Sequence, residues 1–544
     1  MTARFRTAGA RVAGVLLLSV VAAYSGAQAP APQAGEAIYR DGVLPSGAPL
    51  SARREPNMLL SGQAAACSNC HRRSGLGELE GQINIPPVSG TYLFHRRTHN
   101  RDDLDIPYVD GLHFEREPYS EATLARAIRE GLGVDGNPLN YLMPRYSLDD
   151  ADMASLIAYL KVLTPPKVPG VDGAVVHFAT IVTPDADPLK RRAMLSVLEQ
   201  YFADQNGFAL ERNPRTRLPG MKSMARQRWQ LHLWALSGPP SSWEEQLQRF
   251  RAREPVYAAL AGLGGKDWGP VHRFCERAAL PCLFPNVEVP QVKEQDFYTL
   301  YFSRGVLLEA DLLAQQLTAG QTPATPRVVQ VFRLGDVGAA GAAALHATLA
   351  AAGISSVTLP LSMTAGERQL AAALKGLKPA DTLVLWLRSA DVASLEKIPV
   401  RASHVLMSGL MAGLETAPLP SAWRPVTRLA YPIDLPERRV IRVDYALGWL
   451  TLHHIPVLAE QVQVDTYVAC RLVLETMDHL SDAFAPDYLV ERLEGMLEHQ
   501  LISGYYPYLA LAPNERFASK GGYIVHFANA AGPVVLPDTD WRVP

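Results

Sequence analysis

Short apolar runs alternate with helical segments along the larger, C-terminal part of the chain, from about residue 174 to residue 529. Runs rich in β-branched and aromatic residues predict strands, and apolar residues spaced three and four apart predict helices. Strands are expected at 174–182, 229–236, 256–263, 328–333, 382–387 and 404–407, and helices at 190–206, 243–253, 271–279, 339–352 and 367–377. This alternation is typical of parallel sheets with crossover helices, and its length predicts two such sheets.

The first part of the chain has a helical pattern instead. Residues 119–133 contain one apolar helix face, and residues 153–160 contain another, which opens after Ser147-Leu148-Asp149-Asp150, a pattern typical of a helix N-terminus. Residues 164–170 read TPPKVPG, and three prolines cannot continue a helix. We therefore predict an all-α domain at 28–163, a proline-rich linker at 164–173 and a two-lobed α/β domain at 174–544.

The N-terminus has the features of a secretory signal. Arg4, Arg6 and Arg11 precede an apolar run at 12–23, and small residues follow as far as Ala29. This order predicts a signal peptide at 1–27, removed after Ala27, with an uncleaved anchor as the alternative. No later stretch is apolar enough for a membrane helix. We expect a protein exported to the periplasm, without an integral membrane segment once the signal is removed.

Charge and motifs exclude several classes of function. Lys and Arg number 52 against 54 Asp and Glu, and no polybasic patch is present, which excludes a generic nucleic-acid binder. The chain has no G-x-S-x-G elbow, no P-loop and no H-E-x-x-H motif. The sequence therefore predicts a binding protein or an electron carrier rather than an enzyme.

The strongest motif is Cys67-Ser68-Asn69-Cys70-His71, a C-x-x-C-H run. Two thiols at this spacing can form thioethers to one porphyrin, and the adjoining His71 can then ligate the iron as the proximal ligand. The alternatives are half of a zinc site or a redox dithiol, but a zinc site needs a second ligand pair, which the sequence lacks. One covalently attached haem c is the predicted cofactor.

A second haem-related signal is Leu142-Met143-Pro144-Arg145-Tyr146, just before the last helix of the first domain. Pro144 restrains Met143 to an extended conformation, which suits a loop that holds a thioether towards a metal. Met143 is therefore predicted as the distal ligand, and its soft sulfur would favour ferrous iron. The alternative is a core methionine. His95, His99 and His113 are other possible ligands, but their spacing does not single them out.

These motifs make residues 35–163 resemble a class I c-type cytochrome. The resemblance rests on the C-x-x-C-H site, the Met-Pro loop, the last helix ending Ala158-Tyr159-Leu160, and the segments 74–77 and 85–90. It implies a compact helical fold with His71 and Met143 as axial ligands. The segment between Tyr39 and Cys67 is longer than in minimal cytochromes, and we expect it to be a surface excursion.

The second domain resembles the type I periplasmic solute-binding fold, in particular the branched-chain amino acid receptor group. The resemblance rests on residues 298–317, which look like the helix that enters the second lobe, and on 509–523, which look like the closing segment. In such folds the ligand lies between the lobes at the carboxyl ends of strands. The residues expected to face this cleft are Thr183, Asp185, Gly265, Lys266, Asp267, Trp268, Asn286, Asp336, Arg388 and Ser408.

The expected cleft departs from that of amino acid receptors. Those proteins use a Ser/Thr-rich loop for the ligand carboxylate, whereas this chain has Gly264-Gly265-Lys266-Asp267-Trp268. Lys266 and Arg388 could hold an anion, and Trp268 could stack on a flat solute; each could equally be an ordinary solvated or packing residue. Cys275 and Cys282 are close enough in sequence for a disulfide in an oxidising compartment, with two separately buried thiols as the alternative.

The leading hypothesis is a periplasmic monohaem electron carrier fused to a solute-binding module. It would exchange electrons with a periplasmic redox partner such as a dehydrogenase or a downstream cytochrome, and the second domain would dock that partner or sense a small solute. The alternative is a solute receptor with the haem as an accessory or sensor. A haem peroxidase is a third interpretation, but it needs an open iron site, which a Met143 ligand would deny.

Overall fold

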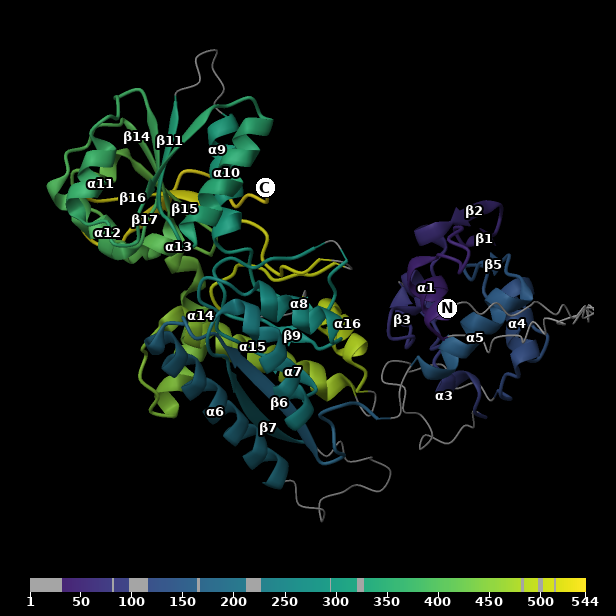
Figure 1. The fold of residues 1–544 in the computed structure, drawn as a ribbon. Helices are drawn as coiled ribbons and strands as arrows, with labels where there is room; N and C mark the ends of the chain where they lie inside the picture. The colour runs from purple at the N-terminus through teal and green to yellow at the C-terminus, as the bar shows by residue number, and fades with distance from the viewer. Residues whose placement is uncertain are drawn as a thin grey trace, which may run out of the picture.

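The computed structural model describes residues 32–80, 83–96, 116–163, 167–211, 227–293, 295–319, 327–480, 484–497, 502–512 and 515–544. These residues form a small N-terminal domain beside a larger body of two α/β lobes (Figure 1). None of the helices in these ranges has the length and apolar character needed to cross a membrane. The predicted signal peptide at 1–27 lies outside the described residues.

Lobe 1 is built on a five-stranded sheet in which every neighbouring pair is parallel. Its strands lie in the order β10-β9-β8-β6-β7, with bounds β6 Val175–Val182, β7 Arg228–Ala235, β8 Ala258–Leu260, β9 Cys282–Leu283 and β10 Thr299–Leu300. Its helices are α6 Pro188–Glu211, α7 Trp243–Arg253, α8 Gly269–Arg277, α14 Pro436–Leu452, α15 Glu460–Leu480 and α16 Pro486–Leu497. Phe178 packs in one core cluster and Ala179 in another, because successive strand residues point to opposite faces and helices cover both.

Lobe 2 repeats this plan and adds two antiparallel strands. Its order is β12-β11-β13-β14-β15-β16-β17, with bounds β11 Val328–Arg333, β12 Ser356–Leu361, β13 Thr382–Trp386, β14 His404–Ser408, β15 Thr427–Tyr431, β16 Tyr523–Phe527 and β17 Val535–Pro537. Its helices are α9 Val306–Ala319, α10 Gly338–Ala351, α11 Glu367–Leu374, α12 Ser389–Ala393 and α13 Gly409–Ala412. In both lobes the first strand lies between the second and the third, which is the doubly wound order. The predicted two-lobed α/β architecture is confirmed.

Three segments of the chain cross between the lobes, and they lie side by side. The chain passes from β10 to α9, from β15 to α14, and from residues 502–522 to β16. Tyr301 N donates to the Arg516 carbonyl at 2.9 Å, Ser519 N to the Phe302 carbonyl at 2.7 Å, and Asp434 N to the Tyr505 carbonyl at 2.8 Å. Adjacent crossings of this kind make a hinge, because few backbone dihedrals need to change for the lobes to move.

In the N-terminal domain, the first and last helices cross closely. These are α1 Pro32–Asp41 and α5 Asp150–Val162, and a Cβ on Gly35 would lie 2.1 Å from the Ser155 carbonyl oxygen. The Tyr39 and Tyr159 rings pack beside this contact with centroids 5.5 Å apart. The remaining helices are α2 Ser68–His71, α3 Gly90–Leu93 and α4 Glu121–Glu130. Asp149, rather than Ser147, caps α5, and its side chain accepts from Asp152 N at 2.8 Å.

The prediction that this domain is all-α is wrong. It contains a three-stranded antiparallel sheet, β2-β1-β5, and a separate hairpin, β3-β4. The bounds are β1 Ser51–Arg54, β2 Met58–Ser61, β3 Glu78–Glu80, β4 Ile83–Ile85 and β5 Arg145–Tyr146. The long segment before Cys67 therefore forms a β-ribbon. Its strands are only four residues long and lack the alternation of apolar and polar residues that reveals a half-buried strand.

The N-terminal domain docks on α16 of lobe 1 through the loop that follows His71, which we call the docking loop (Arg72–Leu76). Arg72 Nη2 donates to Glu494 Oε2 at 2.8 Å, and Ser74 N donates to Glu491 Oε1 at 3.0 Å. Leu76 is buried in the main core cluster of the larger body. The two units therefore share a packed and hydrogen-bonded interface.

Glu494 is the centre of this interface. Its carboxylate pairs with Arg72 on one side and with the buried Arg516 on the other, and its side chain is 4% exposed. Arg516 Nη1 also donates to the Phe297 carbonyl at 2.7 Å. Two guanidinium groups thus share one buried carboxylate, and Arg72 has a second, longer ion pair with Glu78 at 3.5 Å.

We predict that Glu494→Gln weakens the docking of the N-terminal domain. Loss of one partner from a buried ion pair costs about 3–5 kcal/mol, because the remaining charges stay buried without compensation. A protease site placed in the linker at 164–173 allows the two parts to be separated after folding. We expect the cleaved parent protein to elute as one species in gel filtration and cleaved Glu494→Gln to elute as two.

The matched control is Glu437→Gln, which makes the same change at an exposed position on α14 of the same lobe. The cleaved control should still elute as one species. Co-elution of the cleaved Glu494→Gln parts would contradict the importance of this carboxylate.

Candidate haem site and interlobe cleft

A cavity of about 440 Å³ lies between the two lobes, next to the crossings. The carboxyl ends of strands from both sheets reach it, as doubly wound sheets predict. Its lining from lobe 1 and the crossings includes Asp185, Asp187, Lys190, Gly264, Gly265, Lys266, Asn286, Glu288, Phe302, Gln461, Asp465 and Tyr506, and its lining from lobe 2 includes Asp336, Val337, Arg388 and Leu410. The size suits a small molecule.

Six of the ten predicted cleft residues line this cavity: Asp185, Gly265, Lys266, Asn286, Asp336 and Arg388. Thr183 lies just behind the wall, where its hydroxyl donates to Asp185 Oδ1 at 2.8 Å and accepts from Gly265 N at 2.9 Å. Thr183 thereby shapes the loop without facing the cavity.

The other three predicted residues have local structural contacts. Ser408 is fully buried and caps α13, and Asp267 Oδ1 accepts from Gly269 N at 2.9 Å in the first turn of α8. Trp268 is 3% exposed, and its ring fills the space beside Gly262, where a Cβ would lie 2.7 Å from it. The prediction that Trp268 could stack on a solute is wrong, because the indole is part of the lobe 1 core.

Two of the three cations that line the cleft, Arg388 and Lys190, already have carboxylate partners, while Lys266 is exposed at its edge. Arg388 Nη2 donates to Glu288 Oε2 at 2.7 Å, and its Nε donates to Asp336 Oδ2 at 2.9 Å. Lys190 Nζ donates to Glu288 Oε1 at 3.2 Å. Burial would raise the pKa of Glu288, but the hydrogen bonds from Arg388 and Lys190 outweigh it and hold that pKa below its ordinary value. Arg388 therefore completes an ion-pair network across the cleft, and its guanidinium group is already neutralised without an anionic ligand.

Sequence reasoning missed Glu288 and the residues that α15 and the C-terminal segment bring to the cleft. Asp465, on α15, is 7% exposed, and its Oδ1 has no hydrogen-bond partner among the described residues. Its Oδ2 accepts from the Tyr506 hydroxyl at 3.4 Å. Burial raises the pKa of Asp465 to about 8, and the Tyr506 hydrogen bond only partly opposes this rise. The helix also contains Glu460, Arg471, Glu475 and Asp478, so the sequence offered no local signal that singles out Asp465.

In the N-terminal domain, His71 has the geometry of a metal ligand. One ring nitrogen is hydrogen-bonded to the backbone, and the other is left to bind a metal. Its Nδ1 lies 2.9 Å from the Pro86 carbonyl, which can only accept, so Nδ1 carries the hydrogen and Nε2 keeps a free lone pair. Burial lowers the pKa of His71, although the hydrogen bond to Pro86 opposes the change, and the imidazole is neutral near pH 7. A hydrogen bond from the other ring nitrogen to a backbone carbonyl usually fixes the orientation of a histidine that binds a metal.

The two cysteines of the motif fit thioether attachment better than redox chemistry. Cys67 precedes α2 and Cys70 lies within it, so both sulfurs and the imidazole come from one helical turn. Burial raises the pKa of the Cys67 thiol to about 12, whereas a redox dithiol needs a thiolate stabilised well below the ordinary pKa. The residues present therefore fit a covalently held haem.

Met143 lies in the loop just before β5, and the pairing of β5 with β1 holds the end of this loop in place. Directly after it, Arg145 pairs with Arg53 and Tyr146 with Ala52 across β5 and β1. Met143 and Cys67 both pack against the core cluster of the domain. Ligation of iron by Met143 stays a prediction.

The other predicted candidates have different outcomes. His95 is exposed, and His99 and His113 lie outside the described residues. Cys275 and Cys282 are adjacent buried thiols, and their hydrogen bond is the largest reason why the pKa of Cys275 is raised. A disulfide between them stays a prediction.

One other group of ligand-type residues occurs in the described ranges, formed by His272, Glu276 and Asp296. His272 lies between the Asp296 carboxylate, at 2.8 Å, and the Tyr301 hydroxyl, at 3.0 Å. Glu276 accepts from the backbone N–H groups of residues 297–299. Each polar group already has partners, so this cluster is a structural support for the segment leading into the hinge.

The chain matches no protein-family profile and no curated protein. Among solved structures it is similar to a fatty acid ABC transporter substrate-binding protein from Thermomonospora curvata, with 13% identity over 70% of this chain and 95% of that chain and a TM-score of 0.48. A substrate-binding periplasmic protein from Ralstonia solanacearum has 14% identity over 67% and 100%, with a TM-score of 0.47. A putative branched-chain amino acid ABC transporter protein from Rhodospirillum rubrum has 13% identity over 68% and 99%, with a TM-score of 0.45.

We predict that Asp465→Asn stabilises the protein in a pH-dependent way. The pKa of Asp465 in the folded protein is about 8, above its ordinary 3.8, so its stabilising contribution is present below pH 3.8 and is lost as the pH rises through 8. The variant should be more stable than the parent by about 5 kcal/mol at pH 8 and nearly equal to it near pH 4. Urea unfolding at both pH values measures this difference.

Asp444→Asn, an exposed change on α14, controls for loss of a charge from the same lobe and should have no such pH-dependent effect. A gain for Asp465→Asn that is equal at pH 4 and pH 8 would contradict the role assigned to burial of this carboxyl group.

Proposed function

We propose that this protein is an exported receptor for a small solute, with a c-type haem on its N-terminal domain. The observation that carries the proposal is the cavity between two lobes joined by three adjacent crossings. Both lobes contribute side chains to its wall, so a bound solute would contact both and favour the closed arrangement. The protein would be a binding protein rather than an enzyme, and it would work in the periplasm.

The haem is the proposed cofactor of the N-terminal domain. Cys67 and Cys70 would hold it through thioethers, and His71 Nε2 and the Met143 sulfur would be its axial ligands. When bound, the haem supplies one-electron redox chemistry. The Pro86 carbonyl keeps the His71 ring oriented, and the surrounding core keeps water from the ligands.

Electron transfer is the second candidate function, and the free Nε2 of His71 is the observation that favours it. A periplasmic dehydrogenase or a downstream cytochrome would be the redox partner. The solute-binding body would then act as a sensor or as a docking unit beside the haem domain. The receptor function comes first because the two lobes that enclose the cleft make up most of the described chain.

A solute screen on the intact, haem-loaded protein tests the receptor proposal. We expect at least one small solute to raise the unfolding temperature saturably, because a ligand that binds only the folded state stabilises it. Isothermal titration should then give a stoichiometry of one. A broad screen of anions, cations and neutral solutes without any saturable response would contradict the receptor and leave the docking role.

We predict that Met143→Ala keeps the haem but opens its iron to added ligands. The thioethers at Cys67 and Cys70 are untouched, so the haem content should persist, while loss of the soft sulfur should lower the reduction potential. Cyanide or imidazole should bind readily to the variant. The absorption spectrum, including the ferric methionine–iron band, and a potentiometric titration measure these changes.

Met58→Ala is the control, because Met58 is an exposed methionine on β2 of the same domain. It should leave the spectrum and potential unchanged. If Met143→Ala kept the ferric methionine–iron band, Met143 would be only a packing residue.

A further inference from the structure

The wall of the cleft contains a buried acid that has no cation beside it. Asp465 is less than one-tenth exposed, lines the cavity, and leaves Oδ1 without a hydrogen-bond partner among the described residues. Its described hydrogen-bond partner is the Tyr506 hydroxyl. A buried carboxyl oxygen without a partner costs free energy, and a ligand donor is the simplest group to satisfy it.

Glu309 shows that this arrangement is not a general property of buried acids in the molecule. Glu309 is fully buried, and one oxygen accepts from the Ser408 hydroxyl while the other accepts from Leu410 N at 2.8 Å. Glu309 does not line the cavity. Its carboxyl group is a completed structural contact, whereas that of Asp465 is incomplete.

The charges around the cavity favour a positive ligand. Its lining includes five carboxylate residues (Asp185, Asp187, Glu288, Asp336 and Asp465) and three cationic residues (Lys190, Lys266 and Arg388). Arg388 and Lys190 are already paired with Glu288 and Asp336, as described above. An anionic ligand would therefore have to compete with carboxylates for these cations, while a cation would meet an excess of acids.

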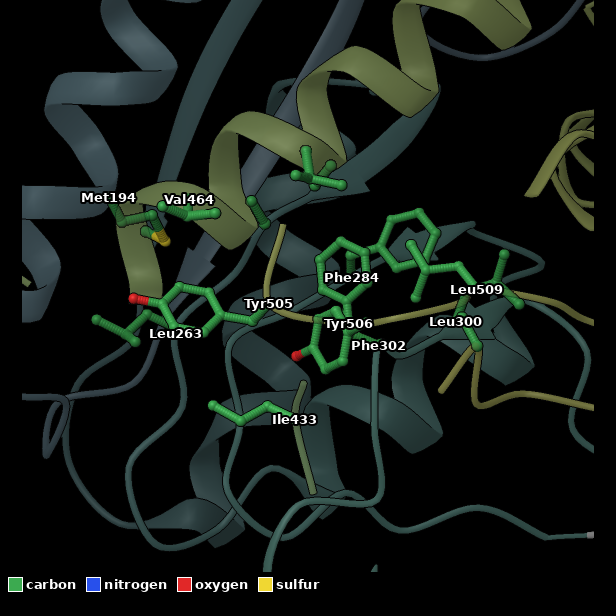
Figure 2. Packing of buried hydrophobic residues seen from close by; sticks show 14 of the residues in the cluster. Met194, Leu263, Phe284, Leu300, Phe302, Ile433, Val464, Tyr505, Tyr506 and Leu509 are labelled. Atoms are coloured by element: carbon green, nitrogen blue, oxygen red, sulfur yellow. The ribbon is translucent and has the colours of Figure 1, made fainter. Parts of the chain in front are cut away.

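Aromatic rings lie next to Asp465. Tyr506 and Phe302 both line the cavity, and their rings are stacked with centroids 5.4 Å apart. Figure 2 shows these two rings together, with Ile433 nearby. The face of an aromatic ring attracts an ammonium group. The Phe302 ring is also stacked against Phe284, with centroids 4.4 Å apart, so Tyr506 is the ring that can act together with the carboxyl group on such a ligand.

We propose that the cleft binds a small organic cation whose primary ammonium group donates a hydrogen bond to Asp465 beside the Tyr506 and Phe302 rings. This inference rests on the proposed solute-binding function and adds the chemical class of the solute. The remaining volume of the cavity would hold the rest of the solute between the lobes.

The test uses the intact, haem-loaded protein and short aliphatic primary amines, each paired with the alcohol in which a hydroxyl replaces the ammonium group. The corresponding carboxylates complete each set. Isothermal titration at pH 9, where Asp465 is ionised and an aliphatic primary amine is still protonated, should show at least one amine that binds about tenfold or more tightly than its alcohol, with the carboxylate weakest. A charged hydrogen bond in a buried site corresponds to about a ten- to hundredfold difference in affinity.

Asp465→Asn should weaken binding of that amine about ten- to hundredfold and should leave binding of the alcohol nearly unchanged. Asp444→Asn, on the exposed side of α14, should bind the amine like the parent. The Asn variant keeps the shape of the side chain and is expected to fold, and its unfolding curve checks this before titration.

The outcomes separate this inference from the proposed function. If alcohols or carboxylates bind saturably and amines bind no more tightly, the receptor function stands and the cationic class is overturned. If amines bind but Asp465→Asn binds them equally well, the role of Asp465 is overturned. If no solute of any charge binds, both the class and the receptor function fail.

Discussion

The buried guanidinium group of Arg516 joins the parts of this molecule that would otherwise be independent. Its side chain has no exposed surface, it pairs with Glu494 on α16, and it donates to the Phe297 carbonyl ahead of β10. Its own carbonyl accepts from Tyr301 N at the first crossing between the lobes. A buried charge of this kind must keep its partners, because the cost of losing one greatly exceeds the cost of losing a surface ion pair. The arrangement of α16, β10 and the C-terminal segment is therefore fixed together.

This constraint relates the N-terminal domain to the hinge. The same Glu494 that neutralises Arg516 also accepts from Arg72, the residue after His71. The docking loop therefore contacts the helix that pairs with Arg516, and the Arg516 carbonyl accepts a hydrogen bond from the first crossing. Phe302 and Tyr506, which belong to the crossings, line the cavity. A short series of contacts thus connects the docked domain to the cavity, and contiguous contacts of this kind can carry energetic coupling between two sites.

The sequence predicted the parts of the fold in which each element carries its own signal. Residues 328–333 are a run of six mostly buried positions, and the predicted strand has the observed bounds. The two-residue strand β10 was missed, because two residues have no periodicity to detect. The β-ribbon before Cys67 was missed because its strands are four residues long and do not alternate between apolar and polar residues, and it became visible only through its pairing with β5.

The site was predictable only as far as strand ends determine it. Asp336 and Arg388 follow β11 and β13, and the rule that ligands bind at the carboxyl ends of parallel strands placed them at the cavity. Glu288 and Asp465 come from a loop and a helix that approach the cavity by tertiary packing. No local pattern distinguishes them, so they required the structure. Trp268 obeyed the strand-end rule but turned inward, because the neighbouring glycines left room for its ring.

The docking of the N-terminal domain has a consequence for the order of biosynthesis. Residues 67–76 emerge from the ribosome early, whereas α16 and Arg516 follow only near the end of the chain. During that interval the C-x-x-C-H segment and the docking loop are uncovered, and afterwards Glu491 and Glu494 hold the loop against lobe 1. An enzyme that modified Cys67 and Cys70 would therefore have freest access to a nascent, incomplete protein. Slower synthesis of the second domain would lengthen that period of access, and earlier docking would shorten it.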